Sequence, residues 1–172
     1  MKEKIIMSDL REELAPTLLV TTSDYETERG KPMPDKNHSI IQGNLIFSLR
    51  LATKNRFSIL PEITLDLPIR ERVPDLAIYE PLVFDPDNNE VRMDELPLCA
   101  IEIISEMQPT SVLMKKRSEY FLAGIKSYWL VMPSMRSIYV FSNLEDFEIY
   151  TYKDRLIDKT LNIELDLSEI FR

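Results

Sequence analysis

The feature that most constrains the fold is the segment LPLCAIEIISEM, residues 96–107, in which one acidic residue interrupts a long apolar run. Between Leu98 and Ile104 every residue except Glu102 is apolar, and such a run, rich in β-branched residues, is typical of a strand buried on both faces. Burying a carboxylate costs several kcal/mol unless the group is neutralised, paired or bound to a metal ion. The segment therefore predicts a central strand whose Glu102 has a partner.

Length and composition predict one domain spanning residues 1–172. Hydrophobic residues make up 44% of the chain and charged residues 29%, which is ordinary for a globular protein. The sole cysteine, Cys99, lies inside the apolar run, which excludes an intramolecular disulfide and a cysteine-rich zinc site and favours a reducing cytoplasm. No segment approaches the roughly 18 apolar residues that span a bilayer, and the N-terminus lacks the apolar region of a signal peptide. We therefore expect a cytoplasmic protein that does not bind membranes.

The charge distribution leaves two interpretations open. Twenty-one basic residues against 29 acidic ones give a net charge of −8, which argues against a protein that coats nucleic acid non-specifically. Basic residues nevertheless outnumber acidic ones between residues 107 and 136. This region forms either a local basic surface for a partner or an ordinary solvated face.

Hydrophobic periodicity predicts a mixed sheet covered by helices, an α/β or α+β fold. Turn-rich residues separate the segments, and Gly124 is a helix stop signal. The expected helices span residues 8–14, 37–55 and 112–123, and the expected strands lie within residues 57–67, 73–80, 98–105, 127–132, 137–142, 147–153 and 160–171.

A second acid, Asp75, lies in the strand-like segment VPDLAIYE. If this segment and the Glu102 strand are neighbours in the sheet, the two carboxylates converge. Magnesium is held in proteins by one or two carboxylates together with water and substrate phosphate, so the pair could form a metal site. In the alternative interpretation Asp75 caps a turn after Pro74 and Glu102 pairs with a core arginine.

The predicted helix after the Glu102 strand adds a cation. At about 100° per residue, Lys116 falls on the apolar face together with Tyr120. Lys115 falls instead beside Glu119 on the outer face. An inward ammonium is costly to desolvate, so Lys116 needs an acidic partner or a ligand. Arg117 also reaches the edge of the inward face, and periodicity alone does not separate it from Lys116.

Three segments, VPDLAIY, CAIEIIS and KRSEYFLAGIKSYWLVMP, closely resemble the Uma2 family of restriction-endonuclease-like proteins. The signature of that family is P-D, then an apolar strand ending in E-apolar-apolar-S, then K-x-x-x-Y-x-x-A-G-apolar-x-x-Y-W-L-V. Residues 116–131 match the last part almost residue for residue. The segment YETERGKPMPDKNHSIIQGNLIFSLRLA is also similar, so the resemblance covers most of residues 25–172 and leaves residues 1–24 as an N-terminal helical extension.

The resemblance implies the PD-(D/E)xK nuclease fold, a central mixed sheet flanked by helices. It implies a phosphodiesterase site that acts on DNA, with Asp75 and Glu102 holding Mg²⁺ or Mn²⁺ and with Lys116 as the third catalytic residue. It also allows a homodimer. In the usual motif the lysine stands two residues after the second acid, where this chain has Ile104; in this family the matching position is Lys116 on the following helix.

Two departures from the family pattern are visible. Val112 stands where the family often has aspartate, and Glu106-Met107-Gln108 replace the proline and small polar residues that often follow the E-x-x-S serine. Together with Ile104 and the net charge, Val112 favours an alternative function: a catalytically inactive nuclease-fold module for binding or assembly.

His38 and Gln42 are further candidates for the site because they lie one helical turn apart and could face it. His38 is the sole histidine, so a Ser-His-Asp or Cys-His site would have to use it. The alternative is that both residues belong to a partly exposed polar face of the helix.

Overall fold

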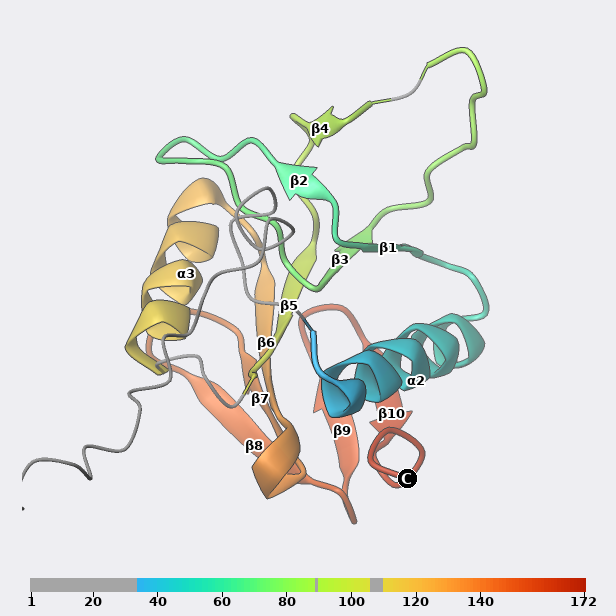
Figure 1. Ribbon diagram of the computed structural model, residues 1–172, viewed down its shortest axis with the longest axis vertical. Helices are drawn as coiled ribbons and strands as arrows, with labels where there is room; N and C mark the ends of the chain where they lie inside the picture. The colour runs from blue at the N-terminus through green and yellow to red at the C-terminus, as the bar shows by residue number, and fades with distance from the viewer. Residues whose placement is uncertain (1–33, 89, 106–109) are drawn as a thin grey trace, which may run out of the picture. The chain divides into compact units, whose positions relative to one another are not determined.

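A six-stranded mixed sheet organises the part of the chain that the computed structural model describes, residues 34–88, 90–105 and 110–172 (Figure 1). β5 and β6 are parallel, and every other neighbouring pair is antiparallel. The predicted mixed sheet is confirmed. In spatial order the strands are β1 (Ser58–Pro61), β3 (Leu76–Tyr79), β5 (Cys99–Ile103), β6 (Ser127–Met132), β7 (Ser137–Phe141) and β8 (Phe147–Thr151).

Each face of the sheet is covered by a different helix (Figure 1). On one face the odd-numbered residues of β5, such as Ile101, pack with α2 (Lys36–Thr53) and with the hairpin of β9 (Arg155–Asp158) and β10 (Ile163–Asp166). On the other face Ala100 and its neighbours pack with α3 (Thr110–Ala123). This coverage explains why every residue of β5 is buried, as its apolar sequence predicts.

The helix boundaries follow local capping chemistry. The side chain of Asp35 caps α2, because its Oδ1 accepts a hydrogen bond from the backbone N–H of His38 at 2.8 Å. α3 ends before Gly124, whose φ of +109° suits glycine and confirms the predicted stop.

Some elements differ from the prediction. The strand expected over residues 57–67 is interrupted at Glu62, which has a left-handed φ of 54°, so it forms β1 and the separate β2 (Thr64–Leu65). β2 pairs with β4 (Arg92–Met93), and neither this pair nor β9 was expected, because two-residue and four-residue strands carry little periodicity. The turn after β6 is a 3₁₀ helix, η1 (Pro133–Met135).

Residues Pro34–Arg172 form one compact unit. The helix expected at residues 8–14, the extension at 1–24 and the departure at residues 106–108 lie outside the described residues. None of the helices in the described part is long and apolar enough to cross a bilayer.

Candidate active site

The strand register brings the two predicted carboxylates together. β3 and β5 are antiparallel neighbours that pair Leu76 with Ile101. Asp75 directly precedes Leu76 and Glu102 directly follows Ile101, so the two acids lie at the same end of this strand pair. The Oδ2 atom of Asp75 also accepts a hydrogen bond from the backbone N–H of Ile103 at 2.6 Å, which anchors the carboxylate across the strand pair.

Glu102, which is only 2% exposed, has both of its oxygens bound by α3. Lys116 Nζ donates to Oε2 at 2.8 Å, and the Tyr120 hydroxyl donates to Oε1 at 2.7 Å. The partner of Glu102 is therefore a lysine, and the alternative of a core arginine is wrong. Lys116 is buried and Lys115 is exposed, as the helical periodicity predicts.

Tyr120 is the contact at this site to which the sequence analysis assigned no role. Its signal was the K-x-x-x-Y spacing of Lys116 and Tyr120, because residues four apart lie on the same face of a helix and can reach one carboxylate together. The two residues thus fix both oxygens of Glu102 from a single helical turn.

The expectation that Glu119 lies on the outer, exposed face of α3 is wrong. Glu119 is 5% exposed: Arg72 Nε donates to its Oε2 at 2.5 Å, and Arg70 Nη2 lies 3.1 Å from its Oε1. Periodicity identified the side of α3 that faces the sheet. It did not show that the segment between β2 and β3 also packs against this helix, with two arginines on its inner side.

The electrostatics of the site are set by burial. Burial raises the pKa of the Glu102 carboxyl above its ordinary value; the Lys116 ammonium opposes this shift, and the nearby Asp75 carboxylate adds to it. Burial, followed by the negative charge of Glu102, also raises the pKa of Tyr120 well above its ordinary value, which keeps its hydroxyl a hydrogen-bond donor. The carboxylates of Asp75 and Glu102 together carry more negative charge than the ammonium of Lys116 offsets, which favours a further cation between them.

His38 and Gln42 both reach Asp75, and the alternative of a partly exposed polar helix face is wrong for the buried His38, whereas Gln42 is half-buried. His38 is 5% exposed, and its Nε2 lies 3.2 Å from Asp75 Oδ2. Gln42 Nε2 donates to the backbone carbonyl of Asp75 at 2.9 Å. The Nδ1 atom of His38 is buried without a hydrogen-bond partner among the described residues.

The chemistry of these donors fits a hard cation. Asp75 and Glu102 supply the one or two carboxylates that Mg²⁺ requires, and the remaining ligands of this ion are water and substrate phosphate. Burial raises the pKa of Glu102 although Lys116 and Tyr120 both lower it, and a cation bound at this carboxylate would lower it as well. No group of three or more His, Cys, Asp or Glu side chains is arranged as a metal cage within the described residues.

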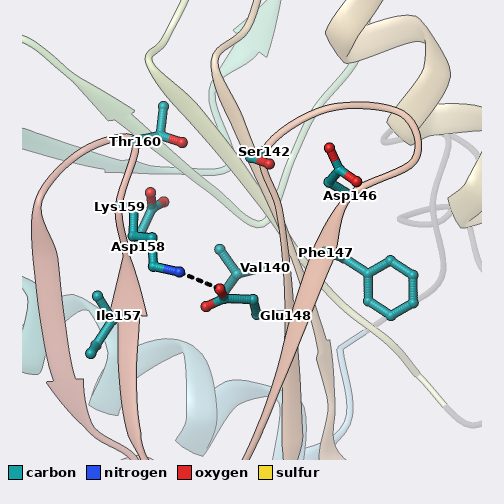
Figure 2. A pocket seen from close by; sticks show the side chains of 9 residues that line it. All are labelled: Val140, Ser142, Asp146, Phe147, Glu148, Ile157, Asp158, Lys159 and Thr160. Atoms are coloured by element: carbon teal, nitrogen blue, oxygen red, sulfur yellow. Dashed lines mark hydrogen bonds and ion pairs between the residues drawn. The ribbon is translucent and has the colours of Figure 1, made fainter.

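A separate cavity of about 290 Å³ lies among β7, β8 and β9 and contains none of the predicted site residues (Figure 2). Lys159 Nζ bonds to Glu148 Oε1 at 2.5 Å at its side. The buried Asp158 is part of its lining. β7 and β8 lie at the other side of the six-stranded sheet from β3, and β9 belongs to a separate two-stranded sheet, so this cavity does not belong to the candidate site.

Comparison with known proteins supports a nuclease fold. The profile of the Uma2 family, described as "Putative restriction endonuclease", matches residues 23–170. A solved structure of "a putative nuclease belonging to DUF820 from Anabaena variabilis ATCC 29413" is similar with a TM-score of 0.70 and 18% identity, covering 81% of this chain and 83% of that chain. The DrdV–DNA complex aligns at a TM-score of 0.46 and 13% identity, over 77% of this chain and 12% of that chain. No curated protein shows a significant match.

Proposed function

The chain belongs to the Uma2 family, described as "Putative restriction endonuclease", and from this premise we propose that it is a metal-dependent endonuclease that hydrolyses phosphodiester bonds of DNA. The observation that carries the proposal is that Asp75, directly before β3, and Glu102, on the neighbouring β5, lie at the same end of this strand pair, with Lys116 bound to the Glu102 carboxylate. Two acids at one end of a strand pair and one lysine on the adjoining helix α3 are the parts that such hydrolysis needs.

Each residue has a role that follows from its contacts. Asp75 and Glu102 would hold the divalent ion, and His38 and Gln42 would fix the position of Asp75 from α2. The ion, when bound, polarises the phosphate and lowers the pKa of the attacking water. Lys116 would leave Glu102 to stabilise negative charge that develops on the phosphate oxygens, or would orient the water. Tyr120 would keep Glu102 in place through its second oxygen.

The proposal is tested by nicking of supercoiled plasmid DNA. We expect the wild-type protein to convert supercoiled plasmid to the open circle in Mg²⁺ or Mn²⁺ and to leave it intact in EDTA, because the two carboxylates alone cannot activate water. Absence of cleavage with either ion under any salt condition would contradict the proposal.

Lys116 and Lys115 form a matched pair for testing the role of the lysine. Lys116→Met is expected to lower the initial nicking rate by about 10²–10³-fold, since removing one donor to developing negative charge has effects of that size. Lys115→Met removes the same charge from an exposed position and should leave the rate unchanged. An equal fall in both variants would mean that only overall charge matters.

The rival function, an inactive nuclease-fold module, has one observation in its favour. Both oxygens of Glu102 are already bound by Lys116 and Tyr120, an arrangement that is stable without any ion. Isothermal titration with Mn²⁺ separates the two functions, because the endonuclease should bind the ion through Asp75 and Glu102 and the inactive module should not.

A further inference from the structure

A second hollow lies at the start of α2, outside the carboxylate site. It has a volume of about 400 Å³. It is formed by the first turns of α2, by η1 with Arg136, and by the last three residues of the chain, 170–172. Its polar lining comes from Asn37, Ser134, Arg136 and Arg172. Among the described residues no aspartate or glutamate lines it, although acidic residues outnumber basic ones by 29 to 21 in the whole chain. The polar part of the lining, which lies beside the apolar residues Ile40, Ile41, Pro133, Ile170 and Phe171, is therefore suited to an anion.

Arg136 is the cation best placed to bind such an anion. Its guanidinium lies 5.5 Å from the centre of the Tyr152 ring, and it has no acidic partner among the described residues. Contact with an aromatic ring leaves the N–H groups of an arginine available for a ligand. Arg172, in contrast, already binds Glu169 at 2.7 Å.

Arg136 lies at the tight turn between β6 and β7. It has a φ of 46° and ends η1, because its backbone N–H donates to the carbonyl of Pro133. This turn fixes the point at which the Arg136 side chain leaves the backbone.

The hollow and the carboxylate site share the start of α2, because Asn37 lines the hollow and the next residue, His38, contacts Asp75. β5 and β6 are parallel and end at the same edge of the sheet, where Ile103 pairs with Val131 and η1 begins two residues later. The turn that carries Arg136 therefore follows the same sheet edge at which Glu102 lies.

We propose that this hollow binds a backbone phosphate of the DNA strand next to the phosphate that is cleaved, with Arg136 as the main contact and Asn37 and Ser134 as hydrogen-bond donors. The proposal rests on the proposed function, since it takes DNA as the ligand. A phosphate one or two nucleotides from the scissile bond is the group that a strand held at Asp75 and Glu102 presents to an adjoining hollow.

The test is the salt dependence of DNA binding, measured by fluorescence anisotropy with a labelled duplex in EDTA so that no cleavage occurs. For each phosphate neutralised, the slope of log K against log salt concentration changes by about 0.9. Arg136→Gln should therefore make the slope shallower by about 0.9 and weaken binding about eightfold at 0.1 M salt, which is 10 raised to 0.9. Arg136→Lys keeps the charge and should retain most of the slope.

The matched control is Arg155→Gln, which removes the same charge from an exposed arginine of β9 that pairs with Glu164. Three results would each overturn the phosphate site. The salt slope could be the same for the wild type and Arg136→Gln, or the slope could fall equally in Arg136→Gln and Arg155→Gln. The wild-type protein could also fail to bind the duplex. Ser134→Asp, which places an acid in the hollow, should weaken binding further and provides a second variant should Arg136→Gln be poorly folded.

The outcomes for this site and for the nuclease activity are distinguishable. If the wild-type protein nicks plasmid DNA but Arg136→Gln has the wild-type salt slope, the phosphate site is rejected and the endonuclease function stands. A changed slope without nicking in any divalent ion would remove the endonuclease and keep a DNA-binding hollow.

Discussion

Asp75→Asn is expected to reduce metal-dependent plasmid nicking by at least about 10³-fold. A bound ion contributes several kcal/mol to stabilising the transition state, and about 4 kcal/mol corresponds to a factor of 10³ in rate. Asparagine removes the negative charge that would hold the ion but keeps an oxygen that can accept the Ile103 N–H bond, so the strand pair should stay intact. The measurement is the initial nicking rate at several Mg²⁺ concentrations, together with the Mn²⁺ affinity.

The matched control is Asp66→Asn, because Asp66 is an exposed acid on the segment that leads towards Asp75. It should nick plasmid at the wild-type rate. Nicking by Asp75→Asn at a rate near that of the wild type would exclude Asp75 from the metal site, and a matching loss in Asp66→Asn would trace the effect to overall charge.

Asp158→Ala is expected to lower the free energy of unfolding by about 3–5 kcal/mol, which is the largest stability effect we anticipate. The carboxylate is 1% exposed and accepts hydrogen bonds from Ser127 Oγ at 2.6 Å, from Trp129 Nε1 at 2.8 Å and from the backbone N–H of Leu161 at 3.1 Å. Each buried donor left without a partner costs about 1–3 kcal/mol. Urea unfolding should show the lower free energy of unfolding, and thermal unfolding should show a fall in Tm of about 10 °C.

Asp94→Ala serves as the control because Asp94 is exposed, and such changes usually stay within about 0.5 kcal/mol. Asp158→Asn should fall between the two, since an amide oxygen can still accept a hydrogen bond while the charge is lost. A stability of Asp158→Ala within 1 kcal/mol of the wild type would show that water replaces the carboxylate and that the β9–β10 hairpin is not fixed by this network.

The accuracy of sequence-based prediction at this site depended on whether the relevant contact was local. The inward direction of Lys116 follows from the 100° step of a helix, and the buried Glu102 strand follows from its apolar run, so both were predictable. The positions of His38 and Glu119 depend on contacts with residues 37 and 47 positions away, at Asp75 and Arg72. Periodicity within one segment carries no information about such contacts.

The fold shows the same division. Long apolar segments such as β6 were predicted with correct bounds, because a continuous run of six strand-forming residues flanked by turn signals has few alternatives. The strand β4 and the pairing of β2 with it were not predicted, because β4 has two residues and the parallel pairing joins segments about 28 residues apart. The residues of β2 fell within the strand expected over 57–67, but their own sequence carried no information about this partner.

The proximity of Asp75 and Glu102 depends on one particular antiparallel register of β3 and β5. Successive residues of a strand point to opposite faces, so a slip of one residue in β3 would move Ala77 and Tyr79 from the α3 side of the sheet to the α2 side and would shift Asp75 relative to Glu102. Insertions in the connection between residues 80 and 98 leave this register untouched, whereas a single residue inserted within β3 shifts it. Evolution can therefore lengthen or shorten that connection freely, but it can alter the strand only in steps of two residues if the two acids are to stay together.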